Sequence, residues 1–315
     1  MQTAPTAAER RAAPGGYRPR GLTAWVDHHL KQLLTLPAVL FVAVLIAFPI
    51  LYTVFLSITN AQGAVTRPFD ITGLQNYVYW LTESDRFWPA VGRTAYFTIL
   101  ALVFEIVIGL AIALLLRKPF RGQGLIRVFL LLPLVATPVA VGMMWLLIFE
   151  PSIGFANVMM KSLGLPPQGW LSDPSQALNT VIFIDVWQWT PMITLICLAG
   201  LSTLPEEPDE AARVDGANAW QRFRHITLPL LYPTLGAAAI LRAIDALKTF
   251  DIIYATKGRG GGSSHEAETL NILAYSESFE YSQYGSASAL LMLFFLFIIG
   301  VLLALAILRK KGNLT

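Results

Sequence analysis

The sequence predicts an all-α, polytopic membrane protein with six transmembrane helices, and three observations carry this prediction. Hydrophobic residues make up 55% of the 315-residue chain, whereas only 14% are Asp, Glu, Lys or Arg. Soluble domains carry about a quarter of their residues as charges, so this chain has too little polar surface for a water-soluble globule. Six segments are apolar over the length of about 20 residues that crosses a bilayer. The third observation is the distribution of basic residues between these segments.

The predicted spans follow the apolar runs of the sequence, at residues 33–58, 93–116, 125–149, 178–204, 230–255 and 286–308. Prolines within the third, fourth and fifth spans predict kinks, which neighbouring helices can accommodate in a membrane. Residues 1–30 are rich in Ala, Pro and Arg and predict a disordered, basic cytoplasmic arm. The apolar run after this arm is too long for a signal peptide and predicts a retained first span. The membrane domain is expected at residues 31–311, followed by a cytoplasmic tail at 312–315.

Basic residues in the connections predict the orientation of the spans. With a cytoplasmic N-terminus, the inner segments hold fifteen Lys and Arg residues and the outer loops hold five. Cytoplasmic loops of membrane proteins carry the excess of Lys and Arg. Both termini are therefore expected in the cytoplasm, and so is the loop at 204–229 between the fourth and fifth spans.

The loop between the fourth and fifth spans has the pattern of a short helix that ends at a glycine. Proline and four acidic residues suit the first turn and its positive dipole end. Asp209 and Glu210 each lie within helical reach of Arg213. Ala212 and Gly216 are four residues apart, so a small-residue face would let another protein approach closely. The loop is thus predicted to be a docking segment as well as a connection.

The same loop resembles the signature loop of permease subunits in binding-protein-dependent ABC importers. The pattern is E-A-A, three residues, G, nine residues, and I-x-L-P, and it is matched at Glu210, Ala211, Ala212, Gly216, Ile226, Leu228 and Pro229. Further motifs resemble the maltose-type carbohydrate-uptake branch, namely G-L-x-N-Y at 73–77, F-W at 87–88, L-L-P at 131–133, D-G-A at 215–217 and F-D-x-I-Y-x-T at 250–256. The resemblance covers about 33–308. The sequence departs from the family at 257–262, where G-G-P often stands.

The resemblance implies a coupling helix seated in a cleft of a separate ATP-binding subunit, with coupling residues Glu210, Ala211, Ala212, Asp215 and Gly216. It also implies a heterodimer with a second permease subunit, two ATP-binding subunits and an extracytoplasmic solute-binding protein. The implied location is the bacterial inner membrane, and the implied cargo is a sugar or polyol. ATP and Mg are expected on the partner ATPase, because the glycine-rich run at 258–264 lacks the lysine of a phosphate-binding loop. The chain itself is expected to be no enzyme and to bind neither cofactor nor nucleic acid.

Charged residues within the predicted spans are candidates for a substrate pathway, since such residues are costly in a membrane. The fifth span carries charges at three-residue steps along one predicted helical stripe, at Arg242, Asp245, Lys248 and Asp251. Two interpretations stay open, namely pairing that neutralises the charges and recognition of sugar hydroxyls by the aspartates. Phe250 and Tyr254 would offer faces to a sugar ring, and the resemblance implies that this span lines the translocation path.

Two further spans contain isolated carboxylates. For Glu105 and Asp185, hydrogen bonding between helices is the favoured interpretation, and a place in the substrate pathway is the alternative for Asp185. Trp187 and Trp189 are candidates for stacking on a sugar, although packing or interfacial anchoring is the simpler expectation.

A different class of function, an ion- or proton-coupled secondary transporter, would use these same intramembrane carboxylates. Such transporters usually carry an internal repeat, and residues 33–149 and 178–308 show no convincing similarity. An enzyme is not supported, because the four His residues and the single Cys197 form no nucleophile or metal-ligand pattern.

Overall fold

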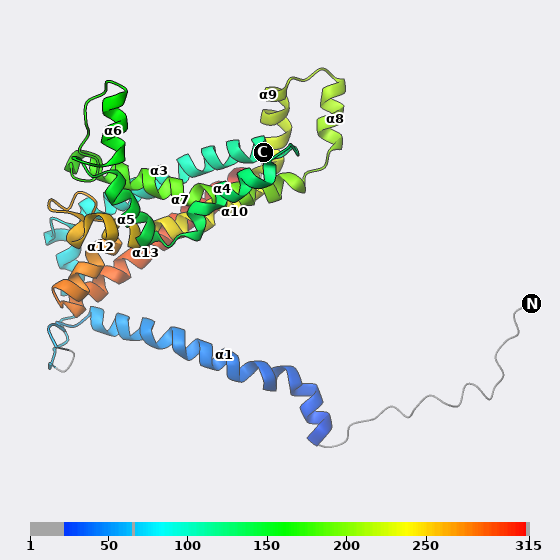
Figure 1. Ribbon diagram of the computed structural model, residues 1–315. Coiled ribbons are helices and arrows are strands. Elements are labelled where there is room, and N and C mark those ends of the chain that lie inside the picture. The colour runs from blue at the N-terminus through cyan, green and yellow to red at the C-terminus, as the bar shows by residue number, and fades with distance from the viewer. Residues whose placement is uncertain (1–21, 65–66, 313–315) are drawn as a thin grey trace, which may run out of the picture. The chain divides into compact units, whose positions relative to one another are not determined.

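The computed structural model describes residues 22–64 and 67–312, and their regular structure is helical (Figure 1). The longer helices are α1 (Leu22–Ser57), α3 (Phe87–Leu115), α4 (Gln123–Val135), α5 (Pro138–Ile148), α7 (Pro174–Ser202), α10 (Leu228–Leu247) and α13 (Tyr284–Gly312). The shorter helices are α2 (Gln75–Val78), α6 (Phe155–Ser162), α8 (Glu207–Val214), α9 (Ala219–Arg222), α11 (Asp251–Lys257) and α12 (Leu270–Tyr275). Residues 1–21 of the predicted arm and 313–315 of the predicted tail lie outside the described residues.

Helix α1 begins earlier than the sequence predicts. Its 36 residues start at Leu22, so residues 22–30 are helical and do not belong to a disordered arm. This stretch contains neither glycine nor proline. Adding residues to an existing helix costs much less than nucleating one, so the apolar helix can extend through the segment. The apolar part that could cross a membrane is Leu34–Ser57.

Helices long and apolar enough to cross a bilayer make up a large part of the described chain. Five helices within residues 22–64 and 67–312 meet this criterion, and α4 and α5 meet it together as one bent pair. These two helices meet at an angle of 99°. The residues between them, Ala136 and Thr137, have extended backbone conformations. A residue before proline disfavours the helical conformation, so Pro138 explains why the predicted kink is a complete break.

The predicted fifth span is also not continuous. Helix α10 ends at Leu247, and α11 starts at Asp251 after a non-helical turn. The prediction of four charges on one helical stripe is therefore wrong, because Asp251 belongs to a different helix from Arg242 and Asp245. The freed carbonyl of Lys248 accepts a hydrogen bond of 2.7 Å from the Asn271 amide. This long-range contact satisfies the end of α10, and no local sequence signal announces it.

Helices α3, α7 and α10 form the centre of the bundle. Gly109 of α3 lies directly against α7, where an added Cβ would stand 2.8 Å from the Ile193 side chain. Small residues allow such close packing between membrane helices. Buried apolar side chains continue this interface towards α10, for example Ile193, Leu201 and Leu231. The central helices thus pack as one body.

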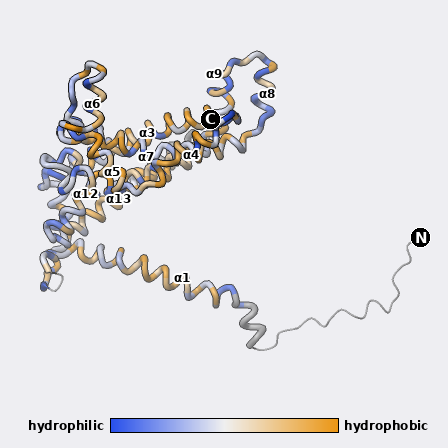
Figure 2. Tube along the Cα trace, viewed as in Figure 1, coloured by the Kyte–Doolittle hydropathy of each residue, from blue (hydrophilic) through white to orange (hydrophobic). Residues whose placement is uncertain are grey.

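Two segments project from this body (Figure 1). Helices α8 and α9 project at one end, and α6 projects at the other. Hydrophobic residues predominate along the long helices, whereas hydrophilic residues are prominent on α8 (Figure 2). The projection of α8 and α9 is the predicted docking loop.

An ion-paired segment closes the end of the bundle near α12. Glu268 is fully buried there, is paired with Arg86, and lies 3.2 Å from His265. Lys257 pairs with Glu266 at 2.6 Å and donates to the carbonyl of Leu171 at 2.6 Å. Partial burial acts to raise the pKa of Glu266, but the Lys257 ammonium and backbone donors outweigh it and hold the pKa below its ordinary value. These contacts order the loop where the sequence departs from the family pattern.

Candidate functional site

The predicted docking loop folds as a helix, a turn and a second short helix. Helix α8 carries Glu207, Asp209 and Glu210 in its first turn, where the helix dipole favours negative charge. The helix ends where Gly216 takes a positive φ of 84°, a conformation that glycine adopts without steric cost. Asn218 then forms a capping box with Gln221 at the start of α9. Local sequence thus specifies each step of the loop.

Ion pairs tie the two helices of the loop together. Asp209 accepts from Arg213 at 2.6 Å and from Arg222 at 3.0 Å. Partial burial acts to raise the pKa of Asp209, but the two guanidinium groups outweigh it and place the pKa below its ordinary value. Of the two acids predicted to reach Arg213, Asp209 is the one that pairs with it. Glu210 is exposed on the helix surface and can therefore meet another protein.

The outer surface of the loop has the character of a docking site. Four of the five predicted coupling residues are exposed and Ala212 is half-buried; the exposed ones are Glu210, Ala211, Asp215 and Gly216. Large apolar side chains accompany them, with Val214 89% and Trp220 64% exposed. A hollow of about 410 Å³ is lined by residues of both helices and the turn, including Ala212, Asp215, Gly216, Gln221 and His225. Sequence reasoning missed Val214, which lies within the predicted segment and is the most exposed large apolar side chain of the loop.

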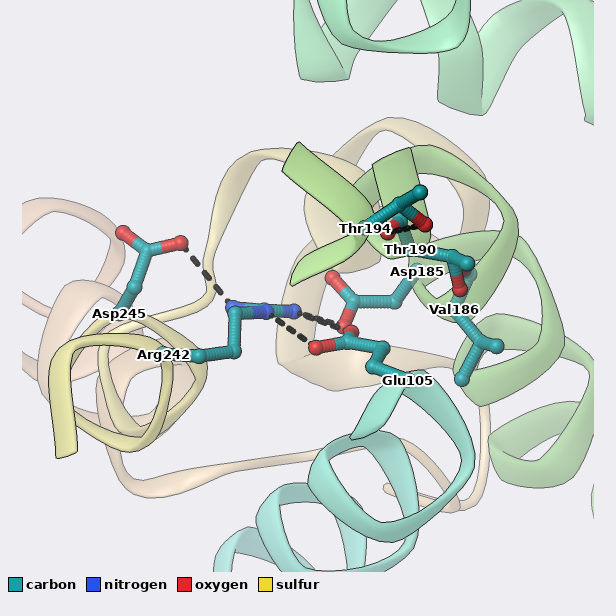
Figure 3. A network of polar contacts seen from close by, with 7 residues as sticks. All are labelled: Glu105, Asp185, Val186, Thr190, Thr194, Arg242 and Asp245. Atoms are coloured by element: carbon teal, nitrogen blue, oxygen red, sulfur yellow. Dashed lines mark hydrogen bonds and ion pairs between the residues drawn. The ribbon is translucent and has the colours of Figure 1, made fainter. Parts of the chain in front are cut away.

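A second constellation lies within the bundle, where Arg242 joins three helices (Figure 3). Its guanidinium is fully buried and contacts Glu105 of α3 with two nitrogens, at 2.7 and 2.9 Å. It also donates to Asp185 of α7, and to Asp245 one turn along α10 at 3.0 Å. Such forked bonds between arginine and carboxylate are strong and directional. The predicted hydrogen bonding between helices for Glu105 and Asp185 is therefore present, with Arg242 as the partner that joins them.

A cavity of about 130 Å³ adjoins this network, lined by Pro138, Asp185, Gln188, Trp189, Asp245, Lys248, Thr249, Phe250, Asp251 and Ile252. Five of the seven predicted pathway residues are in this set. Trp189 was a candidate for stacking on a sugar, whereas sequence reasoning missed Gln188 and Thr249. They are neighbours of predicted residues, and only the rotation of the helices decides which of them face the cavity.

Two predicted pathway residues lie elsewhere. Trp187 packs edge-on against Trp145, with ring centroids 5.4 Å apart, and lines a separate apolar groove between α3, α4 and α7. It is one residue from Gln188 and two from Asp185, so it leaves the helix on another side. Tyr254 stacks on Phe250 at 5.1 Å and contacts Tyr275 at 5.0 Å. It supports the cavity wall from behind.

Both helix breaks meet at the cavity. Pro138 begins α5 after the first break, and Lys248 and Phe250 lie within the second. The Gln188 amide donates to the carbonyl of Ala136, in the first break, at 3.1 Å. Irregular backbone at membrane depth is tolerated where it is buried in protein or lines a cavity. Discontinuous helices of this kind frequently form the substrate sites of transporters.

Metal chemistry finds no support in the described part of the chain. Among residues 22–64 and 67–312, no group of three or more His, Cys, Asp or Glu side chains could hold an ion. The carboxylates that do cluster converge on Arg242.

Comparison with known proteins gives the family. Residues 105–311 match the model of the binding-protein-dependent transport system inner membrane component. The chain is 35% identical over 271 residues to the trehalose/maltose transport system permease protein MalF of Thermococcus litoralis, covering 86% of this chain and 90% of that one. It is 37% identical over 268 residues to the probable ABC transporter permease protein y4oQ of Sinorhizobium fredii, covering 85% of each.

Solved structures show the same fold. A chain of a bacterial ABC transporter that imports the acidic polysaccharide alginate superposes with a TM-score of 0.77 at 20% identity, covering 91% of this chain and 97% of that one. The chain described here belongs to the family of binding-protein-dependent transport system inner membrane components. It is thus an inner-membrane permease component of an ABC transporter and not itself a catalyst. The family expected from the sequence is confirmed.

Proposed function

We propose that this chain is the permease subunit of an importer that moves a sugar or polyol into the cytoplasm, driven by ATP hydrolysis on a separate subunit. The observation that carries this proposal is the exposed loop of α8 and α9, whose Glu210 and Gly216 occupy the signature positions. The loop continues through a π-helical turn directly into α10, one of the central helices. A push on the loop would therefore move the packed bundle as a rigid body.

The proposed topology has six spans, with α4 and α5 together forming the third. Both termini and the loop of α8 and α9 lie in the cytoplasm. The distribution of Lys and Arg between the connections supports this orientation. The membrane domain extends over 31–311, now with α1 as its first helix.

The proposed assembly contains a second permease subunit in a heterodimer, two ATP-binding subunits that hold ATP and Mg, and an extracytoplasmic solute-binding protein. The family description itself names dependence on a binding protein. An alginate ABC transporter of the same fold, with a TM-score of 0.78, has been solved with a periplasmic protein bound to an alginate pentasaccharide. These similarities support the partners of this chain.

Carbohydrate is the proposed cargo because similar permeases carry carbohydrate names. Besides the trehalose/maltose protein, a trehalose permease of Mycobacterium tuberculosis is 31% identical over 291 residues, covering 92% of this chain and 91% of that one. Within this chain, the cavity beside Asp185 is the proposed substrate path. It combines carboxylates that accept hydroxyl hydrogens with the Phe250 ring, which suits a polyhydroxylated molecule.

Uptake by cells that carry a charge-reversed signature residue tests the proposal. In Glu210→Lys, ATP-driven uptake should fall by at least about tenfold, while the amount of inserted subunit stays normal, because the exposed acid would meet a basic group on the ATPase. Glu207→Lys is the matched control, since it reverses a charge in the same helical turn outside the signature, and should retain most uptake. Undiminished uptake in Glu210→Lys would contradict the proposal. Uptake driven by a proton gradient in vesicles without the ATP-binding subunits would favour a secondary transporter instead.

A further inference from the structure

The cavity and the network behind it contain more carboxylates than cations. The carboxylates are Glu105, Asp185, Asp245 and Asp251, and the cations among the described residues of this cluster are Arg242 and Lys248. Arg242 is already bonded to three of the carboxylates and is fully buried behind the wall. Of these two cations, Lys248 is therefore the one that can contact a ligand in the cavity. The carboxylates outnumber the cations, so the cluster carries an excess of negative charge.

The wall of the cavity offers more hydrogen-bond acceptors than donors, and the donors among its lining side chains are the Lys248 ammonium, the Trp189 indole N–H and the Thr249 hydroxyl. Asp185 and Asp245 present carboxylates, with Asp245 half exposed at 49%. Gln188 is 2% exposed, and its side-chain oxygen is buried without a hydrogen-bond partner while its amide is held by Ala136. A buried acceptor without a partner costs free energy that a donor from a ligand can recover. Hydrogen-bond donors on a ligand would therefore find acceptor oxygens in excess.

We infer that, within the import function proposed above, this cavity selects uncharged polyhydroxylated molecules and rejects anionic sugars. Hydroxyl groups supply the donors that the carboxylates and Gln188 lack, whereas a carboxylate, sulfonate or phosphate on the substrate adds an acceptor and a like charge. Repulsion between like charges is strong where water is scarce, because the effective dielectric constant is low. Phe250 offers an apolar face that contributes to binding without regard to charge.

The inference is tested with pairs of related ligands in which one member is neutral and the other carries an anionic group. The complete complex of permease and ATP-binding subunits is placed in lipid nanodiscs without its binding protein, so that the permease alone selects. Binding of methyl glucoside against methyl glucuronide, and of glycerol against glycerol 3-phosphate, is measured by saturation-transfer NMR, which detects weak ligands. The neutral member of each pair should bind at least about tenfold more tightly. This is the effect expected when one anionic group of the ligand meets one carboxylate of a partly buried wall.

Two variants should shift this preference in opposite directions. Asp245→Asn removes a negative charge and should narrow the difference in affinity between the neutral and anionic ligands. Lys248→Gln removes the available cation and should widen it. Asp70→Asn, an exposed position in the segment before α2, is the matched control and should change nothing. A cavity altered only in its packing would not give shifts of opposite sign.

Equal or tighter binding of the anionic members would overturn the inference. Failure of every neutral member to bind would also overturn it, because the cavity would then not be a sugar site. Uptake of neutral sugar by the whole transporter, with its binding protein, is measured in parallel. If uptake is normal and either of these two binding results is found, the inference is refuted and the proposed function stands. If the wild-type transporter takes up no neutral sugar, the proposed function is refuted.

Discussion

Replacing Arg242 by methionine should strongly destabilise the fold, because this one side chain neutralises carboxylates from two other helices. Methionine keeps the unbranched stem of the side chain to about the position of Nε and removes the charged guanidinium. Glu105 is fully buried and Asp185 is 1% exposed, so both would lose their counter-ion without access to water. Breaking a buried ion pair by removing one partner costs about 3–5 kcal/mol. Asp245 is 49% exposed and should add no more than about 1 kcal/mol, as surface pairs do.

The assay is the unfolding free energy of the purified complex in detergent, measured by denaturant titration. Adding Glu105→Gln to Arg242→Met should restore a large part of the loss, because the double variant buries one charge fewer. Arg222→Met is the control, since it breaks the partly exposed pair with Asp209 and should cost about 1 kcal/mol or less. A loss in Arg242→Met no larger than that of the control would refute the structural role assigned to this network, as would the absence of any coupling with Glu105→Gln.

Three further predictions concern packing, capping and pH. Gly142→Leu should reduce the amount of folded subunit, measured as the monodisperse fraction in gel filtration. Even a Cβ at position 142 would stand 2.9 Å from the Cβ of Ala255, so a larger side chain would force α5 and α11 apart. An unchanged monodisperse fraction would contradict this packing. Asn218→Ala should destabilise the loop of α8 and α9 by about 1 kcal/mol through loss of its N-cap, seen as faster hydrogen exchange in α9, with exchange in α3 as the internal control. Partial burial acts to raise the pKa of Asp209, but Arg213 and Arg222 outweigh it and hold the pKa below its ordinary value. The ion pairs therefore stabilise the loop above about pH 4, and this contribution is lost as the pH falls through the folded-state pKa. Asp209→Asn at neutral pH should mimic the acid state in the same exchange measurement, and equal protection of the wild type and the variant would contradict the pairing.

Much of the architecture could be predicted because it is encoded locally. Apolar runs indicated the spans that the structure contains as long helices, and proline, acidic residues and glycine indicated the loop of α8 and α9. Pro138 announced a kink at the place where α4 and α5 part. Each of these signals acts through backbone conformation or burial within a few residues of its own position.

The features that sequence reasoning missed depend on contacts between distant segments. Helix α10 ends at Leu247, and the carbonyl of the next residue, Lys248, accepts a hydrogen bond from Asn271, which lies 23 residues further along the chain. No nearby residue in the sequence therefore indicated this helix end. Arg242 finds Glu105, 137 positions away, although spacing alone favoured neighbours on its own helix. Which of two adjacent residues, Trp187 or Gln188, faces the cavity depends on the rotation of α7 about its own axis. Such a choice is made by packing and not by composition.

The central claim is that the loop of α8 and α9 meets a nucleotide-hydrolysing partner on the cytoplasmic side. The single native cysteine, Cys197, is buried in α7, so a Cys197→Ala background allows one reporter cysteine at a time. Val214→Cys places it on α8 at a site that is 89% exposed and outside the signature residues. Ile153→Cys, at a site 82% exposed just before α6, is the matched control at the other end of the bundle.

The most direct measurement is photo-crosslinking from these two cysteines in membranes of cells that express the whole transporter, using a benzophenone maleimide. The account predicts that the reporter at position 214 crosslinks to the ATP-binding subunit and resists a membrane-impermeant thiol reagent added from outside. The reporter at position 153 should react with the impermeant reagent added from outside and should not crosslink to the ATP-binding subunit. Labelling of position 214 from outside, or its crosslinking to the solute-binding protein in place of the ATP-binding subunit, would contradict the account.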